Sequence, residues 1–358
     1  MVGSRRSTVT PDGGKKMKAK FLALILMMGL VFTTSGGSFS QNAAPKNISF
    51  KILTINLLFS EITDRTLRLT RIADYVQSTY GSSSTTPVDV LLLQEVVGGS
   101  LVGTNNSAQD LQTLLANRGL TYYLDFQLEE SFLIPGVFIQ GIAILSRYPR
   151  VARQFIVLAN VETVTFLGLT VTLPRICLMN RIAIPNYGQV NIYNTHLCSE
   201  CDASGRAQQI NTMLNFIQSV EQSSPPGDQI FLGGDFNLDL NDPNQRPGYQ
   251  TILNNGFIDT YNAIHHVGFT CCDPNSGGAC CTYALPGNPY AFDPTTLQIE
   301  LPARLDYIFS RGKGMRILDS EVVFNNGDWV SDHSGLVSQI QLNQGGAPTG
   351  ALDLLLLD

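Results

Sequence analysis

The chain has 358 residues, 44% of them hydrophobic, so it can bury a sizeable core as one large domain or as two smaller ones. Its 23 Lys and Arg residues are outnumbered by 29 Asp and Glu residues. This acidic balance does not favour a protein that binds nucleic acid through a broad basic surface.

The first 40 residues have the order of a secretory signal. Lys and Arg residues precede the apolar run FLALILMMGLVF, and small residues then lead to Gln41. The run is too short to span a bilayer comfortably, so we expect cleavage and a secreted, extracellular or periplasmic, protein. Removing residues 1–40 takes away six basic residues and one acidic residue, which leaves a formal charge of −11. We expect residues 41–345 to form a single domain and residues 346–358 to be a disordered tail.

The next part of the chain predicts alternating strands and helices. Leu67, Leu69, Ile72 and Val76 give the first helix an apolar side, and Gly119 is placed to end the second. In chain order, we expect a strand at 48–58, a helix at 64–77, a buried strand at 88–96 and a helix around 107–118.

The remaining chain is richer in strands. Asn186-Tyr187-Gly188 predicts a hairpin, and the spacing of Ile210, Leu214 and Ile217 predicts a helix. We expect an α/β fold of two packed mixed sheets flanked by helices, a four-layer α/β sandwich. The elements are strands near 121–127, 139–146, 152–158, 174–184 and 189–196, a helix at 203–221, a strand, loop and helix over 229–256, and strands near 303–309, 315–324 and 334–341.

The segment FLGGDFNLDL, residues 231–240, places Asp235 and Asn237 after an apolar strand. Residues two apart on a strand share a face, so both can point into solvent, and Gly233 and Gly234 allow a close approach to the backbone. A carboxylate beside a carboxamide suits a metal-bound water or a phosphoryl oxygen. Taken alone, the segment is explained equally well by a strand that runs into an Asx-turn.

Four other strand-like segments carry polar residues where a buried apolar run is interrupted. Such groups cost free energy unless they are paired, so five coincidences suggest one shared site at a sheet edge. The residues are Asn56 after KILTI, Glu95 in LLLQEV, Asn194 and His196 in NTHL, and Asp306 in LDYIF with Asp332 and His333 in the following SDH.

This ordered set of motifs resembles the endonuclease/exonuclease/phosphatase superfamily of DNase I-like hydrolases, over about residues 48–341. Within that superfamily the chain is most similar to the secreted neutral sphingomyelinases. Three details carry the finer likeness: GIAILSRYP at 141–149, Arg206 and Gln209 after NTHL, and FDPTT at 292–296. The likeness departs between LDYIF and SDH, where an aromatic-tipped membrane hairpin is common in bacterial members but only Phe324 and Trp329 are aromatic here.

Glu95 is the best candidate ligand for a divalent cation, because an anionic oxygen at a sheet edge suits a hard ion such as Mg²⁺. Asn56 is a second oxygen ligand candidate, and the resemblance adds Asp332. The alternatives are a solvated carboxylate at a strand end for Glu95 and a chain-turning residue for Asn56. Mn²⁺ or Co²⁺ could substitute for Mg²⁺.

Histidine chemistry completes the expected site. His333 can accept a proton from an attacking water, and the resemblance assigns Asp306 the role of orienting it. His196, protonated or as a hydrogen-bond donor, could stabilise the transition state with Asn194 and Asn237. Asp235 could protonate the leaving oxygen or position the nucleophile. His265 and His266 have no motif around them and are expected at the surface.

Seven cysteines in an exported chain favour disulfides over metal-thiolate sites, and the odd number leaves at least one without an internal partner. The predicted hairpin near Tyr187 brings Cys177 close to Cys198 or Cys201. The remaining bridges are expected to join the 271/272 pair to the 280/281 pair.

The sequence therefore predicts a secreted Mg²⁺-dependent phosphodiesterase that hydrolyses sphingomyelin to ceramide and phosphocholine, with a phospholipid substrate, transient membrane contact and a monomeric state. The alternatives are a secreted DNase I-like nuclease and a phosphoinositide or inositol-phosphate phosphatase. A nuclease would need a basic face near the site, and a phosphatase would need clustered Lys and Arg. The apolar segment SFLIPGVFI, residues 131–139, could contact lipid or belong to the core.

Overall fold

The computed structural model describes residues 47–343 except 59–63, 81–85, 101, 104, 133–135, 137, 160–161, 167–168, 224–228 and 294–297. The expected signal peptide, the expected tail and part of SFLIPGVFI lie outside the described residues. Everything described belongs to one compact unit that begins at Pro45.

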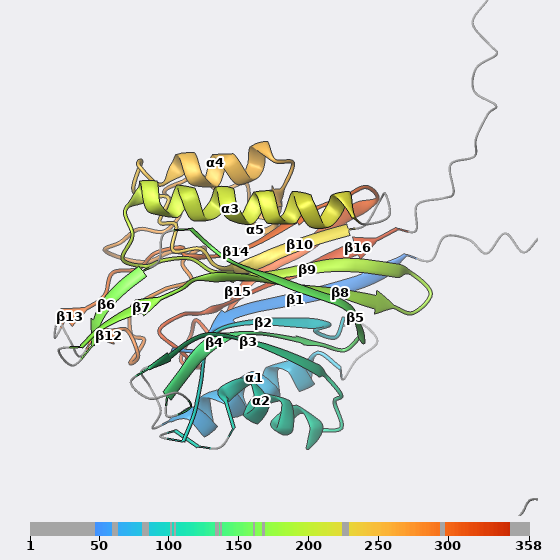
Figure 1. Ribbon diagram of the computed structural model, residues 1–358, viewed down its shortest axis with the longest axis horizontal. Coiled ribbons are helices and arrows are strands. Elements are labelled where there is room, and N and C mark those ends of the chain that lie inside the picture. Colours follow the sequence, from blue (N-terminus) through green and yellow to red (C-terminus); the bar gives the residue numbers. More distant parts are fainter. Residues whose placement is uncertain are drawn as a thin grey trace, which may run out of the picture. The chain divides into compact units, whose positions relative to one another are not determined.

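Two six-stranded mixed sheets form the centre of this unit (Figure 1). The first has the order β15 (Met315–Val323), β16 (Gly335–Leu342), β1 (Ile48–Asn56), β2 (Val90–Gly98), β4 (Phe138–Ser146) and β3 (Tyr123–Phe132). The second has the order β11 (Ile258–Asp259), β14 (Asp306–Arg311), β10 (Gln229–Asp235), β9 (Gly188–His196), β8 (Ile176–Ile184) and β5 (Arg150–Val157).

Helices cover the outer face of each sheet (Figure 1). The first sheet packs on α1 (Arg65–Ser78) and α2 (Ser107–Ala116), and the second packs on α3 (Ala203–Gln222) and α4 (Arg246–Asn254). A short helix, α5 (Thr260–His265), follows β11, and two small hairpins pair β6 (Glu162–Phe166) with β7 (Leu169–Leu173) and β12 (Phe292–Asp293) with β13 (Gln298–Ile299). The expected four-layer α/β sandwich is confirmed.

The central strands are apolar on both faces because each sheet is buried on both faces. In β8, Leu178 and Ile182 enter the core between the sheets, whereas Cys177 and Met179 enter the core under α3 and α4. In α1, Leu69, Ile72 and Val76 are buried as predicted, but Leu67 is 49% exposed. Among the described residues, no helix is long and apolar enough to cross a membrane.

The disulfide prediction was correct for the loop and wrong for Cys177. Cys271 pairs with Cys280 and Cys272 with Cys281. Cys198 pairs with Cys201, however, and Cys177 is a buried free thiol. The hairpin register sets Cys177 opposite Thr195, two residues short of the expected position, and the Cys177 side chain faces the core under α3.

The topology brings the carboxyl ends of four strands to one edge. Strand β1 runs parallel to β2, and β9 runs parallel to β10 with His196 directly opposite Asp235. Parallel strands end at the same edge of a sheet, so polar residues at these ends are gathered there. Gly234 permits this pairing: its φ is +142°, and a Cβ at this position would collide with the carbonyl oxygen of Thr195.

We predict that Gly234→Ala destabilises the fold far more than Gly188→Ala. Gly188 has a similar φ of +139° but open space around it, so its substitution adds only backbone strain of about 1–3 kcal/mol. Gly234→Ala adds the collision with β9 to the same strain. The free energies of unfolding of both variants, measured in urea, test this, and equal losses would contradict the close approach of β9 and β10.

Candidate active site

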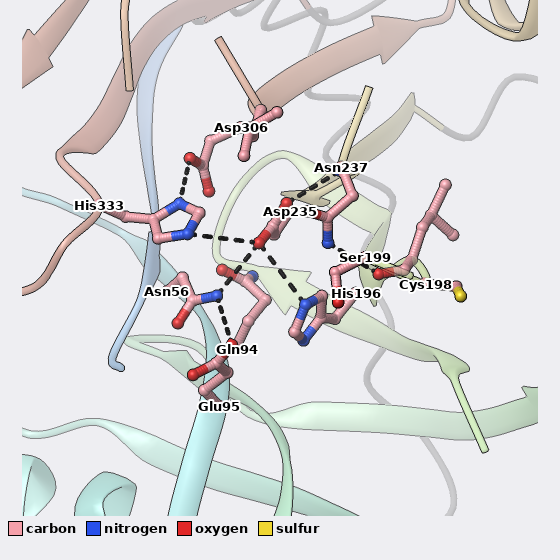
Figure 2. Close-up of polar contacts among 12 residues, drawn as sticks. Asn56, Gln94, Glu95, His196, Cys198, Ser199, Asp235, Asn237, Asp306 and His333 are labelled. Carbon is pink, nitrogen blue, oxygen red and sulfur yellow. Dashed lines mark hydrogen bonds and ion pairs between the residues drawn. The ribbon is translucent and has the colours of Figure 1, made fainter. Parts of the chain in front are cut away.

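The carboxylate of Asp235 lies at the centre of the gathered residues (Figure 2). Its Oδ2 atom is 3.1 Å from Nδ2 of Asn56, 3.5 Å from Nε2 of His196 and 3.7 Å from Nε2 of His333. Burial raises the pKa of Asp235 to about 7; His333 lowers it and Asp306 raises it, but burial is the largest effect. Near neutral pH this group can therefore hold or release a proton.

The segment after β10 holds Asp235 in place. The backbone N–H of Asn237 donates to Oδ1 of Asp235 at 2.9 Å, and Asn237 adopts a φ of +48°. Its side-chain Nδ2 donates to the carbonyl of Leu197 at 2.9 Å, just beyond β9. The Asx-turn considered as an alternative is thus present, and it is part of the site.

His333 and Asp306 form a buried pair. Nδ1 of His333 is 2.8 Å from Oδ2 of Asp306, which directs Nε2 toward Asp235. Burial alone would lower the pKa of His333, but Asp306, Asp235 and Asp332 raise it well above the ordinary value of 6.5. The carboxylate thus orients the imidazole as expected for a general base and its partner.

His196 differs from His333 in its charge state. Burial, followed by the positive charges of Arg175 and His333, holds the pKa of His196 well below 6.5, so its imidazole is neutral. Nη1 of Arg175 lies 3.0 Å from Nδ1 of His196. Because a guanidinium can only donate, Nδ1 accepts and the proton resides on Nε2, which faces Asp235.

Arg175 is a site residue that the sequence analysis missed. It is 3% exposed, and its Nη1 also lies 3.9 Å from the buried carboxylate of Glu129. No motif marks it, since it stands in the link before β8, and only the fold brings it to His196.

Glu95 and Asn56 lie beside one another. Nδ2 of Asn56 donates to Oε1 of Glu95 at 3.1 Å, and the Glu95 side chain is partly exposed (Figure 2). A register shift between Leu93 and Val96 marks a bulge in β2, where Glu95 has a φ of +51°. Bulges of this kind redirect a side chain at the edge of a sheet.

Asn194 and Asp332 form hydrogen bonds with groups other than the carboxylate of Asp235. Asn194 lies between the sheets: its Nδ2 donates to the carbonyls of Leu93 and Ala143, and its Oδ1 accepts from Gln94. Both of its amide hydrogens are therefore used, and this geometry does not support the expected contact of Asn194 with a transition state. Asp332 is half-buried, and its Oδ1 accepts from Ser331 Oγ and the His333 N–H.

Glu300, also missed by the sequence analysis, lies close enough to Asp332, Glu95 and Glu200 to interact with their charges. We call this group of four carboxylates the mouth of the site. Burial raises the pKa of Glu300 to about 7, and the charges of Asp332, Glu95 and Glu200 add to this increase while His333 opposes it. These carboxylates make the mouth acidic. Arg206 and Gln209, by contrast, are buried on α3 and bond the backbone around Cys198.

The donor set fits a divalent cation. Ligand atoms of Asp235, Asp306 and His333 lie within 4.8 Å of one another, and Oδ1 of Asp306 is buried without a hydrogen-bond partner. Carboxylate and amide oxygens prevail at this edge, as hard cations require. Because Asp306 and His333 already share a 2.8 Å hydrogen bond, the partly exposed carboxylate of Glu95, to which Asn56 donates, is the more accessible ligand for an ion that enters from solvent.

The sequence model of the Endonuclease/Exonuclease/phosphatase family matches residues 53–333, a span that contains every residue of the candidate active site. The chain belongs to this family. Its members' fold and this buried donor set identify the chain as a phosphoesterase with a site suited to a metal ion. No curated protein matches the chain in sequence.

Solved structures of the family share the fold. A family member from Beutenbergia cavernae aligns with a TM-score of 0.59 and 22% identity, over 85% of this chain and 73% of its own. One from Leptotrichia buccalis aligns with a TM-score of 0.55 and 22% identity, over 81% and 99%. TDP2 from D. rerio, complexed with a single-strand DNA product, aligns with a TM-score of 0.52 and 17% identity, over 82% and 98%.

We predict that Glu95→Gln and His333→Ala each lower turnover by on the order of 10²-fold or more with the fold intact. Asp74→Asn, which removes a carboxylate from the exposed side of α1, is the matched control and should retain full activity. Excess EDTA should abolish hydrolysis by the native protein. Undiminished hydrolysis in EDTA would show that no metal takes part.

We predict that Arg175→Met lowers turnover by roughly 10 to 100-fold, since residues that fix the tautomer of a functional histidine have effects of this size. The loss should fall on kcat, because Arg175 acts through His196. Arg175→Lys keeps the donor and the charge and should recover part of the rate. If Arg175→Lys is as slow as Arg175→Met, the proposed donation to Nδ1 is wrong.

Proposed function

We propose that the protein is a secreted, Mg²⁺-dependent phosphodiesterase that hydrolyses sphingomyelin to ceramide and phosphocholine by direct attack of water on phosphorus. The metal-ion site and the family support phosphoester hydrolysis. The lipid substrate rests on features around the mouth of the site, given below. Three disulfides support an oxidising location outside the cytosol.

In this mechanism, Nε2 of His333 accepts the proton of the attacking water while Asp306 orients the imidazole. The neutral His196 donates a hydrogen bond from Nε2 to a phosphoryl oxygen, and Asp235, with a pKa of about 7, supplies a proton to the leaving oxygen. Glu95, Asn56 and Asp332 would hold the cation, which neutralises phosphate charge when bound. Only neutral His333 can act as base and only protonated Asp235 can act as acid, so activity should rise with pH as His333 loses its proton and fall again as Asp235 loses its proton above about pH 7.

One observation carries the lipid proposal: an exposed apolar face stands next to the acidic mouth. Phe292 and Ile299 pair across the β12–β13 hairpin and therefore share a face, and they are 49% and 76% exposed. Leu301, two residues after Ile299, is 64% exposed. Neighbouring residues of an extended chain point to opposite sides, so Glu300 faces the site while its neighbours face solvent.

This arrangement fits a lipid whose headgroup enters the site. Three large apolar side chains beside one another can enter a bilayer surface, where each loses contact with water. The carboxylates of Glu300 and Glu200 suit the positive charge of choline next to the phosphate. Bacterial sphingomyelinases commonly contact the membrane through an aromatic hairpin between LDYIF and SDH. Here the exposed residues Phe292, Ile299 and Leu301, which lie before LDYIF, could make that contact instead.

A nuclease is the main rival, and the structural likeness to TDP2 with bound DNA product favours it. A DNA strand would have to approach through the acidic mouth, and the expected mature chain carries a formal charge of −11. A phosphoinositide or inositol-phosphate phosphatase would need several basic groups for its additional phosphates. Arg175, the arginine that contacts His196, is buried.

Parallel assays with sphingomyelin, phosphatidylcholine, a phosphoinositide and supercoiled DNA, each with and without EDTA, test the proposal. We expect Mg²⁺-dependent release of phosphocholine from sphingomyelin and far slower DNA nicking. Rapid DNA cleavage with sphingomyelin untouched would replace the lipid by nucleic acid and leave the phosphoesterase assignment standing.

The apolar face is tested by Ile299→Glu. This variant should lose most activity on sphingomyelin vesicles yet keep its rate on the water-soluble p-nitrophenyl phosphorylcholine. Val151→Glu, at a residue that is 50% exposed on the edge strand β5, is the matched control and should retain both activities. Equal vesicle rates for the two variants would remove the support that this face gives to a lipid substrate.

A further inference from the structure

The cysteine-rich loop has a structural feature that the chemistry above does not use. Its bridges, Cys271–Cys280 and Cys272–Cys281, each span nine residues. Cys272, Cys280 and Cys281 are at most 2% exposed and belong to the core between the sheets. The loop is therefore fixed to the core immediately before Thr282.

Thr282 bonds the backbone of Asp306 and the backbone of the residue that follows His333. Its carbonyl oxygen accepts the backbone N–H of Ser334 at 2.6 Å, one residue after His333. Its Oγ1 accepts the backbone N–H groups of Leu305 and Asp306, each at 3.0 Å. Thr282 is fully buried, so one side chain and one carbonyl join the start of β14, which carries Asp306, to the segment before β16 that carries His333.

The residues after Thr282 extend this contact along the SDH motif. The ring of Tyr283 lies 4.7 Å from the imidazole of His333, and the Ala284 N–H donates to the carbonyl of Asp332 at 2.9 Å. Asn288 donates to the carbonyl of Ser331 at 2.8 Å. Ala284 has a φ of +47°, a strained conformation for alanine that persists only where the surroundings impose it.

We propose that the doubly bridged loop, residues 271–284, is the element that positions the His333–Asp306 pair, with Thr282 as the positioning residue and Cys272–Cys281 as the bridge that fixes it. The proposal rests on the proposed function only in taking His333 and Asp306 as the general base and its partner. It is independent of the substrate.

The two bridges differ in their effect on Thr282, although they close loops of equal length. Equal loops give equal chain-entropy stabilisation, so removing either bridge should cost similar stability. Only the Cys272–Cys281 bridge ends at the residue that directly precedes Thr282 in the chain. The other bridge ends one residue earlier, and its Cys271 is only partly buried. Displacements of about 1 Å in catalytic groups can lower rates by on the order of 10²-fold.

The test compares the double variants Cys272→Ala/Cys281→Ala and Cys271→Ala/Cys280→Ala in the full chain, with bis-p-nitrophenyl phosphate and Mg²⁺. We expect the first to lower kcat at least about tenfold with little change in KM, and the second to lower it less than about twofold. Thr282→Val should resemble the first variant, and Thr282→Ser, which keeps the hydroxyl, should recover most of the rate. Equal kcat values for the two double variants, or no recovery by Thr282→Ser, would overturn the proposal.

A second readout does not depend on activity. Diethyl pyrocarbonate modifies accessible histidines, and His333 is 5% exposed beneath Tyr283. Peptide mass spectrometry should find His333 modified several-fold faster in Cys272→Ala/Cys281→Ala than in Cys271→Ala/Cys280→Ala, with the exposed His266 as internal reference. Equal labelling of His333 in both variants would overturn the positioning role even if no substrate of the native protein were hydrolysed.

Discussion

The parallel pairing of β9 with β10 is the contact on which the rest of the site depends. It sets His196 opposite Asp235, and it exists because Gly234 has no side chain to collide with Thr195. The antiparallel pairing of β10 with β14 then sets Asp306 opposite Asp235 on the other side. Three strands therefore bring three functional groups to one level of the sheet, and the other sheet adds Asn56 from the end of β1.

The site gathers more charge than a protein core normally accepts. Asp235, Asp306, His196, Arg175 and His333 are each at most 5% exposed. Burying such groups costs several kcal/mol each unless they are paired, and the close contacts among them offset that cost. The opposite pKa shifts of His196 and His333 follow from this arrangement: burial, reinforced by the Arg175 guanidinium, lowers the pKa of His196, whereas the carboxylates around His333 overcome its burial and raise its pKa.

The sequence was sufficient for the layers of the fold and for most polar groups at the strand ends. Periodicity located the long strands and helices, and an apolar run interrupted by Asp, Asn, Glu or His marks a place where a buried polar group needs partners. Arg175, Glu300 and Thr282 could not be found this way, because each reaches the site through the fold and none interrupts a strand. The position of Asn194 between the sheets was not foreseen because alternation along β9 turns it toward the other sheet, and the pairing of Cys177 was misjudged because a shift of two residues in register changes which groups meet.

The spacing of the bridges has a consequence for how the chain acquires them. The three disulfides join cysteines only three, nine and nine residues apart. Such close partners meet often in an unfolded chain, so each bond can form before the sheets assemble. The seventh thiol, Cys177, is fully buried in the folded chain, where burial raises its pKa and keeps it from reacting as a thiolate. Oxidative folding of this protein is thus a local process, and completion of the core protects its result from exchange.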